Sequence, residues 1–277
     1  MDFLTEPLGH AFLRRALFAG VAIAAAAGLL GPFVVQRGLA FLADGLAHAT
    51  FGGIALGLLL GAGLDFAPLV ALPFAVLVAL AIGGVRRRSG LGADVATGVF
   101  FTVSFALGVI GLGLRPAAAP PVDVESLLFG SLLAVSHEGL FAVLAAALVT
   151  LVVLLRLWPQ LAYATFDPEL AALSGVRVAF VEQVLMALVA LVVVAGLRSV
   201  GVVLVSAVII LPAATAHLLA ERPSWIAALS VGLAVGASVL GLFVSYHLNL
   251  AAGATIVVLL GAGFFLALAG SSRRPSS

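Results

Sequence analysis

The sequence predicts an all-α polytopic membrane protein with about nine transmembrane helices, contained in one transmembrane domain over residues 1–277. Of its 277 residues, 64% are hydrophobic and only 9% are charged, whereas a soluble domain has about 25% charged residues. The mean hydropathy is +1.30. Nine spans of about 20 residues would use roughly 180 positions. Little chain is then left for a separate soluble domain.

Nine apolar stretches, separated by charged or turn-forming residues, are the expected spans. They cover residues 16–35, 39–62, 66–85, 92–114, 137–156, 178–198, 200–220, 224–246 and 250–269. The breaks at 63–65 and 247–249 are short, so a re-entrant segment is the alternative there. For 16–35 the alternative is a cleaved signal peptide, because an alanine-rich stretch follows two arginines.

The arginines predict the orientation, since cytoplasmic loops of membrane proteins are enriched in basic residues. If the run Arg86-Arg87-Arg88 is cytoplasmic, nine of the thirteen arginines lie on that side and four on the other. The N-terminus is then outside and the C-terminus inside.

The chain lacks cysteine and lysine, and their absence excludes several kinds of metal and nucleotide site. The chain has no cysteine, which excludes disulfides and thiolate metal sites. All thirteen basic residues are arginine, so the chain cannot form a phosphate-binding loop with its lysine. It also contains no HExxH or GxSxG pattern. A net charge of +1 provides no field that attracts nucleic acid. We therefore do not expect an enzyme.

The main candidate site is the sequence DGLAH at residues 44–48, inside the second expected span. Asp44 and His48 are four residues apart, so they share one helix face. Ionisable groups at membrane depth usually face a bundle interior or a watery path, and this pair suits Zn²⁺, Mn²⁺ or Fe²⁺. A hydrogen-bonded pair that only fixes packing is the alternative. The neighbouring face predicts close helix packing, through the small residues Gly45, Ala49, Gly53, Gly57 and Gly61.

The seventh span offers further oxygen atoms to an ion. Pro212 removes one backbone hydrogen bond and predicts a kink. The freed carbonyl, Ser206 and Thr215 could contact a passing ion or satisfy one another. His137 and His247 fall at the expected outer surface, where they could collect metal or be ordinary interfacial histidines.

Two loops are long. The outer one, 115–136, is proline-rich and then amphipathic over 127–135, which predicts a short helix on the outer face. The inner one contains FDPELAALSGV at 166–176. There Asp167 is placed to cap a helix that starts at Pro168, with Glu169 in its first turn and Gly175 at its end. Such a helix is either a docking element for a cytoplasmic partner or a solvated turn.

Five ordered blocks resemble the bacterial zinc, manganese and iron ABC-transporter permeases of the ABC-3 family, whose zinc members are the ZnuB-type proteins. The blocks are residues 13–61, 124–136, 165–176, 201–216 and 245–259. The chain departs from many relatives at Asn249, where they have aspartate, and at Ala252, where they have proline. These departures put a ligand role for the 247–249 turn in doubt.

The resemblance implies a type II ABC importer permease in the bacterial inner membrane. By similarity, two copies surround a central path, two cytoplasmic ATP-binding subunits bind below, and an extracytoplasmic metal-binding protein docks above. Asp44 and His48 would contact the metal, and Ser206, Thr215 and His247 are the further candidates that the residues themselves suggest. The coupling helix would be 165–176, including Phe166, Asp167, Glu169, Leu170 and Gly175.

The resemblance also implies a mechanism. Zinc is the favoured cargo, with manganese or iron as the other candidates. The ion would bind only transiently and move by alternating access, no cofactor would stay bound, and ATP would act only through the partner subunit. An ATP-independent secondary metal transporter or channel is the alternative.

Overall fold

The computed structural model describes residues 9–63, 66–116, 132 and 135–271, and the regular elements in these ranges are all helical. The helices are α2 (Ala11–Gln36), α3 (Ala40–Leu59), α4 (Ala67–Ser89), α5 (Ala93–Gly113), α7 (His137–Arg156), α8 (Trp158–Phe166), α9 (Pro168–Leu173), α10 (Val178–Val200), α11 (Val202–Leu219), α12 (Pro223–Leu248) and α13 (Ala252–Ser271).

Nine of the described helices are long and apolar enough to cross a membrane, and they match the nine expected spans in order. The largest difference is at the first span, which begins at Ala11 rather than near residue 16. The second break is a turn in which Asn249 has a left-handed backbone with φ 52°. The expected outer helix over 127–135 lies outside the described residues except for Leu132 and Val135, and so do positions 64–65 of the first break.

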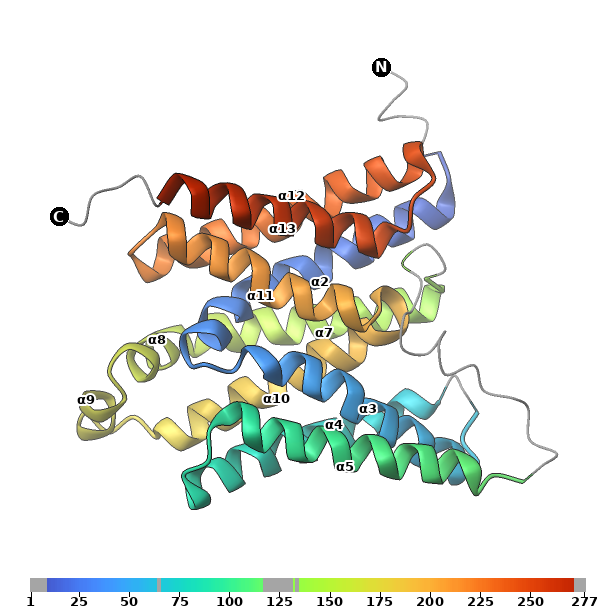
Figure 1. Cartoon of the computed structure of the whole chain (residues 1–277), viewed down its shortest axis with the longest axis horizontal. Coiled ribbons are helices and arrows are strands. Elements are labelled where there is room, and N and C mark those ends of the chain that lie inside the picture. The colour runs from blue at the N-terminus through green and yellow to red at the C-terminus, as the bar shows by residue number, and fades with distance from the viewer. Residues whose placement is uncertain (1–8, 64–65, 117–131, 133–134, 272–277) are drawn as a thin grey trace.

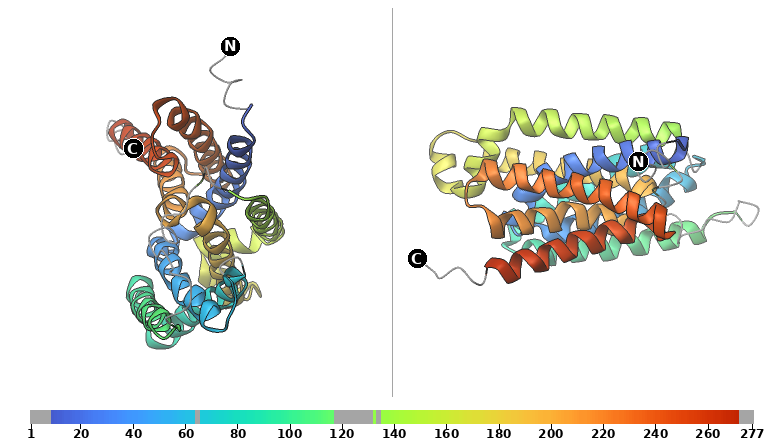
Figure 2. Two further views of the ribbon diagram at one scale, coloured as in Figure 1. Left: turned by 90° about the vertical axis from the view of Figure 1, so that its right-hand side faces the viewer. Right: turned by 90° about the horizontal axis from the view of Figure 1, so that it is seen from above.

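The nine spans form two layers (Figures 1 and 2). In the first layer, nearer the viewer in Figure 1, the helices follow the order α13, α11, α3 and α5, with neighbours in contact. In the second layer, the order is α12, α2, α10 and α4, and α7 packs on the outer side of α2 and α10. Helix α2 is packed against α7, α11 and α12, so the first expected span is a central helix of this fold. Helix α3 is an inner helix of the first layer.

Small residues let α3 approach its neighbours closely, as expected from its glycine-rich face. A Cβ atom on Gly53 would lie 2.8 Å from the Cα atom of Ala71 in α4, and one on Gly52 would lie 2.5 Å from the backbone oxygen of Ser104 in α5. Any larger side chain at these positions would push the helices apart. The close packing therefore holds α3 in a defined position.

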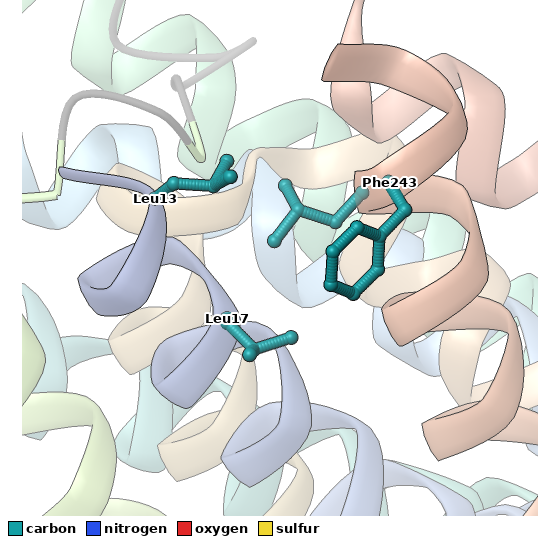
Figure 3. Close-up of a pocket in the computed structure, with 4 residues that line it drawn as sticks. Leu13, Leu17 and Phe243 are labelled. Atoms are coloured by element: carbon teal, nitrogen blue, oxygen red, sulfur yellow. The ribbon is translucent and has the colours of Figure 1, made fainter. Parts of the chain in front are cut away.

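The helices at the periphery of the bundle expose apolar side chains. Leu107 on α5, Leu148 on α7 and Leu266 on α13 are each more than half exposed. An exposed apolar surface of this kind suits contact with lipid chains. The interior is apolar as well: in Figure 3, Leu13 and Leu17 of α2 and Phe243 of α12 line a small gap that has no polar wall.

The arginine-rich connections come together at one end of the bundle. Arg37, Arg86, Arg156, Arg177 and Arg222 lie at helix ends on the side of α8 and α9 (Figure 1). This distribution agrees with the expected cytoplasmic side. We refer to it as the cytoplasmic end.

We expect Gly53→Ala to lower the stability of the protein, because the added methyl group would meet the α4 backbone. Overpacking of this kind costs about 1–3 kcal/mol. Thermal unfolding in detergent measures the effect.

The control is Gly98→Ala in α5, where an added Cβ meets nothing within 4 Å and alanine favours the helix. Equal melting temperatures for the two variants would contradict close packing at Gly53.

Candidate functional site

Asp44 and His48 lie in the first three turns of α3 on one face of the helix. The Oδ1 atom of Asp44 is 4.0 Å from the Nε2 atom of His48. This separation is too long for a hydrogen bond. The two side chains are 41% and 30% exposed, on a helix whose other side chains are mostly buried. The hydrogen-bonded packing pair, the alternative reading of this sequence, is therefore not what the structure shows.

Aromatic side chains of α5 flank the pair. The His48 ring centroid is 5.1 Å from that of Phe101 and 6.1 Å from that of Phe105. Phe41, one turn before Asp44, is 38% exposed. Asp44 and His48 are thus polar groups on an otherwise apolar face, where each keeps free atoms for a further ligand.

Asp44 and His48 alone do not make a complete metal site. Among the described residues, no group of three or more histidine, cysteine, aspartate or glutamate side chains could hold a metal ion. A divalent ion held by protein ligands usually needs four or more donors. An ion bound here would therefore need further donors, from hydroxyl or backbone oxygens, from water or from another chain.

The hydroxyl groups expected from α11 are buried. Ser206 and Thr215 are 7% and 4% exposed, respectively, and the Thr215 hydroxyl donates to the Leu211 carbonyl of its own helix at 2.7 Å. The Ser206 hydroxyl is buried without a hydrogen-bond partner. Pro212 lies inside α11 as expected. A metal-contacting role for Ser206 and Thr215 stays a prediction.

The outer histidines lie at the opposite end of the bundle from the arginine-rich connections. Arg15 Nη1 lies 3.0 Å from His137 Nε2, and Arg15 Nε donates to the Val135 carbonyl at 2.9 Å. His247 is exposed, and its ring centroid is 5.3 Å from that of Tyr246. His137 and His247 are thus separated from Asp44 by most of the length of the bundle.

At the cytoplasmic end, α8 and α9 connect α7 to α10. Helix α9 starts at Pro168 as expected, and the Asp167 carboxylate accepts a hydrogen bond from the Leu170 backbone N–H at 2.9 Å. Gly175 follows the helix with φ +86° and open space around it, a conformation that favours glycine. The Tyr163 hydroxyl of α8 lies 3.1 Å from the Ser174 hydroxyl. The short helix is therefore fixed at both ends.

This segment exposes large apolar side chains outside the membrane-spanning helices. Phe166, Leu170 and Leu173 are 50%, 49% and 85% exposed, respectively. Exposed apolar patches of this kind occur at protein–protein or membrane contacts. We call these three residues the apolar patch of α8–α9.

Arg37 is a link that the sequence did not reveal. It follows α2 directly, and its Nε donates to the Thr165 hydroxyl of α8 at 2.9 Å. Burial lowers the pKa of Arg37, an effect partly offset by the Glu182 carboxylate and reinforced by Arg86. Glu182 is 6% exposed and pairs with Arg86.

Comparisons with known proteins agree with this architecture. The family model "ABC 3 transport family" matches residues 9–271. The chain is 35% identical over 266 residues to the manganese transport system membrane protein MntC of Halalkalibacterium halodurans, covering 96% of this chain and 89% of that protein. It is 38% identical over 255 residues to the manganese import system permease protein ScaB of Streptococcus parasanguinis, covering 92% and 89%.

Solved structures show the same fold. PsaBC from Streptococcus pneumoniae in complex with Fab matches with a TM-score of 0.82 and 32% identity, covering 96% of this chain and 94% of that one. An inward-facing metal-chelate type ABC transporter matches with a TM-score of 0.72, covering 94% and 85%, and at 16% identity it supports the fold alone. The family match, the relatives and the nine spans lead to one conclusion: this chain belongs to the ABC 3 transport family and is the multi-pass inner-membrane permease subunit of a metal ABC importer.

Proposed function

We propose that this permease imports Mn²⁺ along a path between two copies of the chain. Asp44 and His48 of each copy are the metal ligands in this path. The observation that carries the proposal is the partly exposed Asp44–His48 pair with its 4.0 Å separation. Metal–oxygen and metal–nitrogen bonds of about 2.0–2.2 Å place neighbouring ligand atoms of a tetrahedral or octahedral ion about 2.8–3.6 Å apart. A small rotation of either side chain would therefore bring both to one ion.

Two copies complete the ligand set. A twofold axis beside the first turns of α3 would bring two carboxylates and two imidazoles to one ion, because such an interface uses the same surface on both subunits. Helices α3 and α11 lie between α5 and α13 in the first layer, so this whole layer is available to the second copy. The partner would also cover the exposed part of Phe41.

The choice of manganese rests on the relatives and on the donor atoms. The curated relatives reported above are manganese systems. Carboxylate oxygens suit Mn²⁺, and the chain contains no cysteine to favour Zn²⁺ through thiolate ligands. Zinc and ferrous iron are the competitors to be tested, since both also accept carboxylate and imidazole ligands.

Transport proceeds by alternating access, driven by ATP-binding subunits that dock on the apolar patch of α8–α9. The patch is exposed and well anchored, as a docking element must be. Through Thr165, α8 reaches Arg37, which lies three residues before the start of α3 and seven before Asp44. This contact gives movement of α8–α9 a direct physical route to the metal site.

Removing either ligand should stop import. We expect Asp44→Ala and His48→Ala to lower ⁵⁴Mn²⁺ uptake by at least about tenfold, since loss of a metal contact weakens ion binding, while membrane insertion and assembly with the ATP-binding subunit remain. Uptake into cells that depend on this importer measures the effect, with Zn²⁺ and Fe²⁺ added as competitors.

The matched control is Asp94→Ala, which removes an exposed carboxylate from the first turn of α5 at the same end of the bundle. Normal uptake by both Asp44→Ala and His48→Ala would refute the metal path. Stronger competition by Zn²⁺ than by unlabelled Mn²⁺ would assign the cargo to zinc.

The two-copy arrangement predicts a specific crosslink. The natural chain has no cysteine, so Phe41→Cys introduces a single thiol on the exposed face of α3. We expect oxidation to join two copies through this residue, and a dimer band on a non-reducing gel measures it.

Leu77→Cys is the control, because Leu77 is 66% exposed on α4 in the other layer. If Leu77→Cys forms the crosslink and Phe41→Cys does not, the two copies meet through the second layer, which contradicts this proposal.

The docking role of α8–α9 can be tested separately. We expect Leu173→Ser to weaken co-purification of the ATP-binding subunit by about tenfold or more, as loss of a central apolar contact does, with little effect on thermal stability because Leu173 is 85% exposed.

Leu114→Ser is the control, with 69% exposure at the other end of the bundle.

The alternative of an ATP-independent transporter predicts that the permease alone, in proteoliposomes, takes up Mn²⁺ at the rate of the full complex. That result would reject coupling to ATP hydrolysis.

A further inference from the structure

A groove of about 560 Å³ opens between α4 and α10 at the cytoplasmic end of the bundle. Its basic side is formed by Arg87 and Arg88, and Gln183 contributes an amide from α10. Its apolar side comes from α4, including Leu80 and Gly84. Helices α4 and α10 belong to the second layer (Figure 2). The groove therefore faces away from the layer that we propose to pair with a second copy.

The three consecutive arginines of α4 have different environments. Arg86 pairs with the buried Glu182, so its charge is balanced inside the protein. Arg87 and Arg88 are exposed, and among the described residues no ion pair with them is seen. A guanidinium at the membrane surface that lacks an internal counter-ion attracts anions, and its planar donors suit phosphate in particular.

The apolar surface continues from the groove toward the middle of the membrane. Leu77 and Leu69 of α4 are 66% and 71% exposed. Together with Leu80 and Gly84, they are spaced so that all four lie on one face of the helix. An acyl chain can lie along this stripe while its headgroup reaches the arginines. A free phosphate ion would use only the basic side of the groove.

Gly84 keeps the groove open. A Cβ atom at this position would meet nothing within 4 Å, although the residue lies in the last two turns of a helix, where alanine would be more favourable than glycine. A larger side chain would occupy the space without striking the protein itself. This offers a way to block the groove and leave its charge intact.

We propose that the groove between α4 and α10 binds the phosphate headgroup of an anionic phospholipid of the cytoplasmic leaflet, with Arg87 and Arg88 as the charged contacts. The acyl chains extend along α4, past Leu80 and Leu77. Each basic residue near an anionic membrane surface adds about fivefold to affinity, so both arginines together provide about 25-fold.

The test uses the complete importer in detergent, to which phosphatidylglycerol or phosphatidylcholine is added. Native mass spectrometry counts the bound phospholipids, and thermal unfolding records the stabilisation. We expect phosphatidylglycerol to bind and to stabilise the complex, whereas phosphatidylcholine has a much smaller effect. The double variant Arg87→Gln/Arg88→Gln should lower phosphatidylglycerol affinity about 25-fold, and Gly84→Leu should lower it without a change in charge.

Two matched controls define the site. Arg156→Gln/Arg222→Gln removes two charges from the same end of the bundle outside the groove, and Gly236→Leu adds the same side chain at an open position of α12. Both should retain phosphatidylglycerol. If Gly84→Leu does not fold, the double arginine variant still decides the question.

Three results would overturn the proposal. In the first, the double arginine variant binds phosphatidylglycerol as tightly as the natural chain. In the second, inorganic phosphate at millimolar concentration stabilises the complex as well as the lipid does and displaces it, which would make the groove a site for free anions. In the third, the variant keeps its lipid but loses the ATP-binding subunit, which would make the groove a subunit contact.

Discussion

A carboxylate and an imidazole are partly exposed at membrane depth, and the packing around them is unusually close. Polar groups in hydrocarbon are costly unless they face a partner or a watery path. Helix α5 packs on the first turns of α3 at Gly45, and α4 packs on its later turns at Gly53. Asp44 and His48 remain partly exposed on a helix that is otherwise among the most buried in the bundle.

Two pairs of ionisable side chains in the protein differ in how closely their partners approach each other. Glu182 and Arg86 neutralise each other in the interior, where an isolated charge would be unfavourable. Asp44 and His48 lie too far apart to satisfy each other. A pair that is not hydrogen-bonded and is partly exposed keeps atoms free for a ligand, which supports the proposed metal site, whereas the buried pair is a structural link.

Much of this architecture could be predicted from the chain itself. Hydrophobic runs of span length located the nine helices, and the Asp167–Pro168–Gly175 pattern located α9, because both depend on local sequence. The positions of Ser206 and Thr215 depend instead on how α11 is rotated against its neighbours, and Pro212 gave no information on that rotation. The contact between Arg37 and Thr165 joins residues 128 positions apart, so no local pattern could reveal it. The apolar patch of α8–α9 became informative only when the exposure of its side chains was known.

The position of Asp44 and His48 along α3 has an electrical consequence for a transported cation. They lie about 6 and 12 Å from the first residue of the helix, at the cytoplasmic end of a hydrocarbon layer about 30 Å thick. An ion arriving from outside has then crossed more than half of the membrane field. A potential of 100 mV, negative inside, contributes about 2.3 kcal/mol per unit charge across the whole layer. If Asp44 and His48 hold the ion as we propose, the resting voltage of the cell draws a divalent ion mainly toward these two residues, and its departure into the cytoplasm depends much less on voltage.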